Sequence, residues 1–154
     1  MDEWGPAAVR IAAARKAVGL TEPEVAEAAA LSDAEYADLE SYDDEAFTCI
    51  SLRQLCRLAQ VLTVRPEDIV AAEQGMEHEA VSPTSLVSAL KARMVATQES
   101  TEGFSERVGW AVEELLSDPR RIWEWNVDGL HDLCREIGVQ WLGVLAAWPA
   151  EPQQ

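Results

Sequence analysis

The chain has 154 residues, 48% of them hydrophobic, which is enough for one ordinary domain or two small ones, each with a hydrophobic core. Its formal net charge is -16, with 15 acidic against 6 basic residues in 1–75 and 13 against 6 in 76–154. This charge opposes binding to nucleic acid and anionic membranes and favours encounter with basic partners. No apolar run approaches the ~20 residues of a membrane span, so we expect no membrane association.

The N-terminal sequence has neither a basic n-region nor an apolar h-region, and the three cysteines form no C-x-x-C pair. These features predict a cytoplasmic protein with reduced thiols.

In the first half, helix starts are marked by capping boxes, in which a hydroxyl and a side chain three residues later satisfy each other's backbone N–H groups. The pairs are Thr21 with Glu24, Ser32 with Glu35, and Ser51 with Gln54. Gly19 has the place of a C-terminal cap, and Pro66 suits the first turn of a helix. We predict five helices that share one core, at 6–18, 22–29, 33–40, 52–62 and 66–73.

The second half reads as another helical array after a linker at 75–82. Ser82-Pro83 opens a helix through about residue 98, and apolar spacing predicts one helix spanning 104–115. Further helices are expected to begin at Asp118-Pro119, to cover 130–137 and to cover 141–148. No strand alternation occurs, so the chain is predicted to be all-α, with domains at 1–74 and 83–148 and a disordered tail at 149–154.

Segment 10–70 has a characteristic set of capping and apolar positions, at Leu20, Thr21, Glu24, Val25, Ala26, Leu31, Ser32, Leu39, Glu40, Leu52, Leu55, Leu58, Ala59, Leu62, Val64 and Ile69. With these positions the segment resembles the Cro/C1-type (XRE-like) helix-turn-helix family. The resemblance implies a domain of five short helices whose third helix reads DNA, and hence a regulatory role in gene expression.

The sequence departs from this family where DNA would be contacted. The family usually has Gln at the position of Glu22, and it often has basic or neutral polar residues at exposed third-helix positions that are here Asp33, Ala34, Glu35, Ala37 and Asp38. Where the family often has Gly, this chain has Ala30. A left-handed conformation there would cost about 1 kcal/mol.

Ten acidic residues and no basic one lie between Lys16 and Arg53. Because DNA affinity depends on Lys and Arg neutralising phosphates, this surface should repel DNA. We therefore expect the acidic face to bind a basic protein partner. The residues assigned to this face are Glu22, Asp33, Glu35, Asp38, Asp43 and Asp44.

The alternative is a repressor-like DNA-binding transcriptional regulator, in which dimerisation, a bound cation or the bases that border the acidic region supply the phosphate contacts. Those bases are Arg10, Arg15, Lys16, Arg53 and Arg57.

Five of the six tryptophans follow residue 100. Trp123 and Trp125 cannot share one helix face, so we expect one of them to face solvent or a partner. The pair could support homodimerisation through the C-terminal domain, or could make a second local core contact.

No motif supports catalysis, a cofactor or a metal site. Neighbouring acids such as Glu113-Glu114 point to different sides of a helix and lack any companion motif. His131 and Cys134 are too few ligands for zinc, so Cys134 is expected to be a packed thiol.

Overall fold

A computed structural model describes residues 4–149, which fold into eleven α-helices and one 3-10 helix. The first six helices are α1 (Ala7–Val18), α2 (Glu22–Ala28), α3 (Asp33–Ser41), α4 (Glu45–Thr48), α5 (Leu52–Leu62) and α6 (Pro66–Val70). The others are α7 (Pro83–Thr97), α8 (Thr101–Val108), α9 (Glu113–Ser117), the 3-10 helix η1 (Pro119–Glu124), α10 (Val127–Ile137) and α11 (Trp141–Ala146). The prediction of an all-α fold is confirmed over residues 4–149, where the only strand-like feature is an isolated bridge between Trp4 and Ala71.

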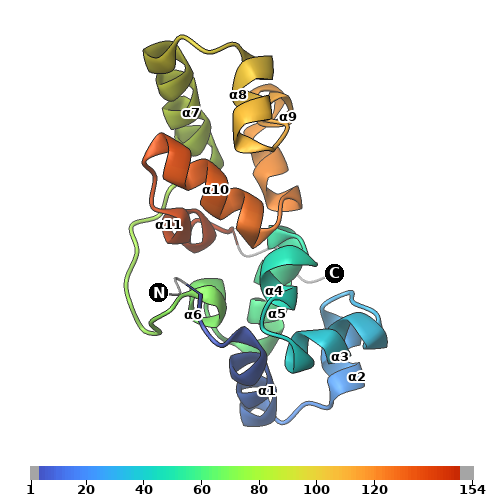
Figure 1. Ribbon diagram of the computed structural model, residues 1–154. Coiled ribbons are helices and arrows are strands. Elements are labelled where there is room, and N and C mark those ends of the chain that lie inside the picture. The colour runs from blue at the N-terminus through green and yellow to red at the C-terminus, as the bar shows by residue number, and fades with distance from the viewer. Residues whose placement is uncertain (1–3, 150–154) are drawn as a thin grey trace.

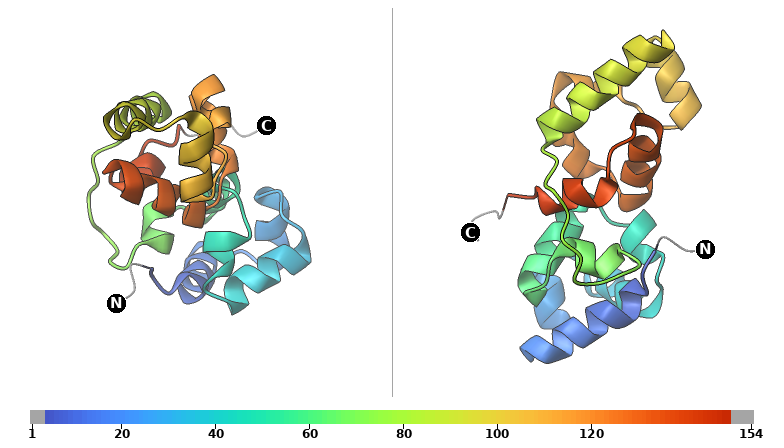
Figure 2. Two further views of the ribbon diagram at one scale, coloured as in Figure 1. Left: turned by 45° about the horizontal axis from the view of Figure 1, so that its top comes forward. Right: turned by 90° about the vertical axis from the view of Figure 1, so that its left-hand side faces the viewer.

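The helices are arranged as two lobes, one above the other (Figure 1). We call residues 4–72 the first lobe and residues 83–149 the second lobe, and Figure 2 shows the connecting segment running along one side of the molecule. Within residues 4–149, no helix is both long and apolar enough to cross a bilayer. Apart from Pro149, the predicted disordered tail lies outside the described residues.

The helices depart from the predictions most clearly in three places, and elsewhere their ends differ by at most three residues. The single helix expected over 104–115 is wrong, because Gly109 adopts a left-handed conformation (φ 82°) that ends α8. The short helix α4 has no counterpart among the predicted helices. The helix expected at 66–73 ends at Val70, because Ala71 is extended and pairs with Trp4.

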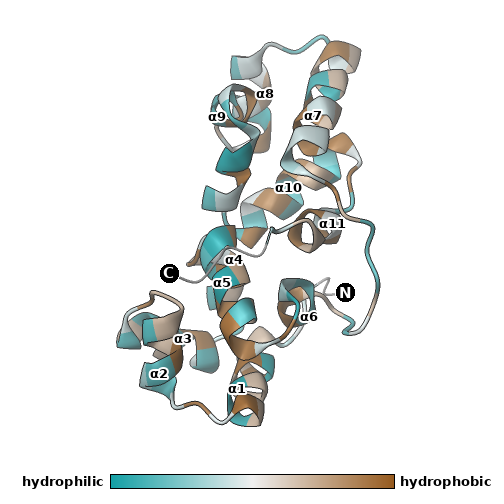
Figure 3. Cartoon of the chain, turned by 180° about the vertical axis from the view of Figure 1, so that it is seen from behind, coloured by the Kyte–Doolittle hydropathy of each residue, from teal (hydrophilic) through white to brown (hydrophobic). Residues whose placement is uncertain are grey.

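The buried residues of both lobes form one continuous hydrophobic cluster. Backbone and side-chain hydrogen bonds also join the lobes: the N–H of Leu52 donates to the carbonyl of Trp125 at 2.7 Å, and Asn126 Nδ2 donates to the carbonyl of Thr48 at 3.1 Å. Helix α11 is largely hydrophobic, as Figure 3 shows, and five of its six residues are buried. A helix that is apolar on all sides belongs in an interior, and α11 contacts both α6 and α10.

The segment predicted as a linker, 75–82, is held at both ends. The N–H of Gly75 donates to Asp68 Oδ1 at 2.8 Å, and the N–H of Val81 donates to the carbonyl of Gly143 at 2.9 Å. A Cβ atom at Gly143 would overlap the carbonyl oxygen of Glu79, so only glycine allows this close approach. The segment is therefore packed against α11.

Candidate functional site

Helices α2 and α3 begin where the sequence predicts. In both, the capping box is complete: Thr21 Oγ1 accepts from the N–H of Glu24 at 3.3 Å, and Ser32 Oγ accepts from the N–H of Glu35 at 3.0 Å. The box at Ser51 is complete as well. These caps hold the exposed acids of α2 and α3 in place beside each other, and the two helices are in extensive contact.

The turn between α2 and α3 contains Ala30 in a left-handed conformation, with φ of 59°. Its strained position is stabilised by the helix end, since the N–H of Leu31 donates to the carbonyl of Ala26 at 2.8 Å. The resembling family often has glycine at this position, which implied a left-handed residue in the turn, and the structure confirms that conformation.

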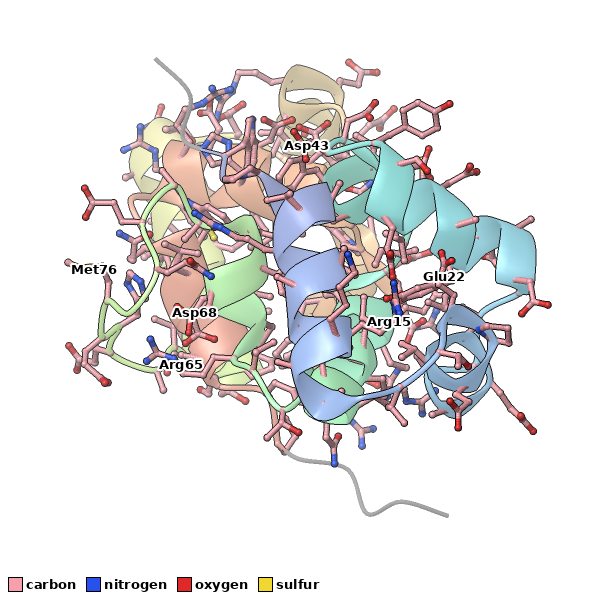
Figure 4. All side chains as sticks on the ribbon, turned by 90° about the horizontal axis from the view of Figure 1, so that it is seen from below. Arg15, Glu22, Asp43, Arg65, Asp68 and Met76 are labelled. Atoms are coloured by element: carbon pink, nitrogen blue, oxygen red, sulfur yellow. The ribbon has the colours of Figure 1, made fainter. Side chains whose placement is uncertain are left out.

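Four of the ten acids in this stretch make structural contacts. Glu24 and Glu35 complete the capping boxes, and the hydrogen bond from the N–H of Ser32 lowers the pKa of Glu35. Asp43 Oδ1 accepts from the N–H of Ala8 at 3.0 Å, at the start of α1. Asp43, which Figure 4 labels near α1, therefore caps that helix from a distant segment.

Glu40 forms the one tight ion pair of the acidic stretch among the described residues. Arg15 Nε and Nη2 donate to its carboxylate at 2.6 and 3.1 Å, and both side chains are nearly buried. Burial is the largest single influence and raises the pKa of Glu40, but the hydrogen bond and the charge of Arg15, with smaller contributions from Tyr36 and Lys16, together outweigh it and lower the pKa. The fully buried Tyr36 lies beside this pair, and burial together with the Glu40 carboxylate raises the pKa of its phenol.

The side-chain carboxylates of the other six acids form no hydrogen bond or ion pair with any residue in 4–149. They are Glu22, Glu27, Asp33, Asp38, Asp44 and Glu45. Five of the six are exposed, and Glu45 is partly buried. The unneutralised charge thus lies on α2, α3 and the start of α4. Of the six residues that the sequence assigned to the acidic face, Glu35 and Asp43 have structural roles, whereas Glu22, Asp33, Asp38 and Asp44 remain open to solvent.

The candidate phosphate-binding bases are largely committed to contacts inside the protein. Arg10 donates to the carbonyls of residues 68, 69, 71 and 72 at the end of α6. Arg15 binds Glu40, and Arg53 pairs with Glu124 at 2.8 Å while its guanidinium lies over the Trp148 ring.

The two remaining bases of that set differ in accessibility. Lys16 is exposed, whereas Arg57 is half-buried. Lys16 is thus the one member of the set that the structure leaves fully open to solvent.

Both tryptophans proposed for self-association are interior residues. Trp123 is 4% exposed and Trp125 is 7% exposed, so the expectation that one of them faces solvent is wrong. Trp123 packs edge-on against Trp148 with ring centroids 4.9 Å apart, and Trp125 stacks on Trp110 at 5.2 Å. Two residues that are two positions apart cannot share one helix face, as expected. However, η1 ends between Trp123 and Trp125, so each ring packs against a different aromatic residue in the core.

Sequence reasoning missed the role of Trp4. Its ring lies 4.7 Å from that of Phe47, 4.8 Å from that of His131 and 5.4 Å from that of Trp141. Trp4 thus joins α4 of the first lobe to α10 and α11 of the second. A tryptophan outside any predicted helix carries no periodic signal that would place it.

The cysteines and histidines supply no metal centre among the described residues, where no three potential ligands converge. Cys134 is buried as predicted, and burial raises the pKa of its thiol to about 12. His131 lies between the rings of Trp4 and Trp141.

No family profile, curated protein or solved structure matches the chain.

Proposed function

We propose that this is a regulatory protein whose first lobe has a Cro/C1-like helix-turn-helix arrangement and whose acidic face binds a basic protein partner. The acidic face is defined here as the four exposed carboxylates of Glu22, Asp33, Asp38 and Asp44. The observation that carries the proposal is that these carboxylates form no hydrogen bond or ion pair within residues 4–149, while Arg10 and Arg15 of the same lobe are bound to other groups.

Electrostatics argues for a protein partner over DNA. In the resembling family, the residues of the third helix face the duplex, and here that helix carries Asp33 and Asp38 and contains no basic residue. Carboxylates cannot neutralise phosphates, which supply most of the affinity for non-specific DNA. Fixed, unpaired carboxylates instead attract Lys and Arg on another protein and accelerate encounter with it.

The alternative, a repressor-like DNA-binding regulator, has less support. Arg10, Arg15 and Arg53 would have to leave carbonyl, carboxylate or indole partners to reach phosphates. Breaking such contacts costs free energy that each phosphate contact would first have to recover. Lys16 alone is too small a contribution for tight binding.

Two measurements on the full chain test the proposal. The first is the affinity for random duplex DNA at ~50 and ~200 mM salt, where phosphate binding must weaken steeply. The second is the affinity for a short arginine-rich peptide, measured by fluorescence anisotropy under the same conditions. We expect little DNA binding and salt-sensitive peptide binding.

A matched pair of variants separates the acidic face from the overall charge. The face variant Glu22→Gln, Asp33→Asn, Asp38→Asn should weaken peptide binding several-fold more than a control with the same charge change on α8 and α9. The control is Glu102→Gln, Glu106→Gln, Glu114→Gln, all at exposed positions. Equal weakening by both variants, or tight and steeply salt-dependent binding of DNA by the wild type, would refute the proposal.

A further inference from the structure

A pocket of about 520 Å³ opens where the two lobes meet, beside one end of the acidic face. Its lining comes from the segment before α1, from α4 with its preceding turn, and from the first turn of α10. This volume is within the range of about 300–1,000 Å³ that is typical of ligand sites. The pocket exists only because α4 and α10 pack together, so no single segment of the sequence predicts it.

Two aromatic rings form the apolar part of the lining. Trp4 and Phe47 lie with ring centroids 4.7 Å apart and planes inclined by 32°. The Trp4 ring is supported by His131 and Trp141, which contact it from the second lobe. Tryptophan is the side chain whose ring attracts a cation most strongly.

Three carboxylates complete the lining, and none of the described residues that line the pocket is basic. Asp43 uses one oxygen to accept from the N–H of Ala8. The carboxylates of Asp44 and Asp128 form no hydrogen bond or ion pair with other residues in 4–149. An apolar pocket with aromatic walls and three unneutralised acids is complementary to a group that is both planar and cationic.

We propose that this pocket binds an arginine side chain of the basic protein partner. Arginine fits better than lysine, because its flat guanidinium stacks on aromatic rings and donates two parallel hydrogen bonds to a carboxylate. The aliphatic stem of the side chain would cover the apolar part of the lining. This inference rests on the proposed function, since Asp44 belongs to both the acidic face and the pocket. It adds that an arginine side chain anchors the partner.

The test uses the full chain and three small peptides. Acetyl-Gly-Arg-Gly-amide is titrated into isotopically labelled protein while the indole N–H resonance of Trp4 is followed by NMR. The same titration is made with citrulline, a neutral analogue of arginine, and with lysine in place of arginine. We expect the arginine peptide to shift the Trp4 resonance with saturation and the citrulline peptide to bind at least about fivefold more weakly, as loss of a solvated charge pair implies.

Variants of equal charge then locate the site. Asp44→Asn with Asp128→Asn should weaken the arginine peptide at least about fivefold, whereas Glu102→Gln with Glu106→Gln, at exposed positions of α8, should leave its affinity nearly unchanged. If the first pair disturbs folding, Asp128→Asn alone, in the partly exposed first turn of α10, should still give about half of that effect on a logarithmic scale.

The outcomes distinguish the two proposals. Equal weakening by both pairs would show diffuse charge attraction and overturn the pocket while leaving the acidic face in place. Equal binding of the citrulline or lysine peptide would overturn the assignment to arginine. If the arginine-rich peptide of the previous section also fails to bind, the acidic face itself is refuted.

Discussion

Replacing Ala30 by glycine should stabilise the protein. Ala30 is exposed and sits in the turn between α2 and α3 with φ of 59°. A left-handed conformation costs an L-residue roughly 1–2 kcal/mol, and glycine avoids this because it has no Cβ. Glycine also gives the unfolded chain more conformational freedom, which offsets about 0.4–1 kcal/mol of the gain. We therefore expect Ala30→Gly to raise the free energy of unfolding by roughly 0.5–1 kcal/mol.

The matched control is the same chemical change in a helix. Ala37 is exposed in the middle of α3, where Ala→Gly costs about 1 kcal/mol. Urea unfolding followed by circular dichroism should thus give midpoint shifts of opposite sign for Ala30→Gly and Ala37→Gly, with unchanged slopes. If both variants lose stability by similar amounts, the left-handed assignment at Ala30 is incorrect.

Three further predictions concern a cap, a charge and the core. Ser32→Ala should lower the free energy of unfolding, measured in urea, by about 0.5–2 kcal/mol. Glu35→Gln should lower it much less, because the amide oxygen still accepts from the N–H of Ser32. Equal losses for the two variants would contradict the capping box. Arg107 lowers the pKa of Glu99 to about 2 from 4.5, so Glu99 contributes stability above its unfolded pKa that is lost as the pH falls towards 2. Glu99→Gln should therefore destabilise the protein at pH 7 but hardly near pH 2, and an equal effect at both would argue against this ion pair. Trp123→Ala should lower the free energy of unfolding by about 3–5 kcal/mol and leave the sedimentation coefficient unchanged. A change in the oligomeric state would instead show that Trp123 lies in a self-association interface.

The helices of the first lobe could be read from the sequence because their signals are local. A capping residue such as Ser32 and its partner Glu35 lie three positions apart, so the same residues that identify the helix start also form it. The left-handed turn at Ala30 was similarly visible from the family resemblance. Apolar spacing failed at 104–115, because the periodic pattern continues through Gly109 while the backbone does not.

The acidity of the stretch between Lys16 and Arg53 is determined by the sequence alone. Which of its carboxylates are paired and which remain exposed and unpaired is determined by the tertiary structure. Glu40 is neutralised by Arg15 from another helix, and Asp43 caps α1 from 35 positions away. The commitment of Arg10 to the end of α6 depends on the same packing. Such pairings join residues distant in the chain, and periodicity carries no information about which of them meet.

The tryptophans show this limit most clearly. Their residue numbers establish that Trp123 and Trp125 cannot lie on one helix face, but burial of both depends on Trp148 and Trp110 reaching them from different segments. Trp4 likewise meets His131 and Trp141 only where the two lobes pack, and the pocket with Asp44 and Asp128 forms at the same junction. Local propensity thus determines the helices and the charge of their surfaces, while long-range packing decides which charges and rings remain available to a partner.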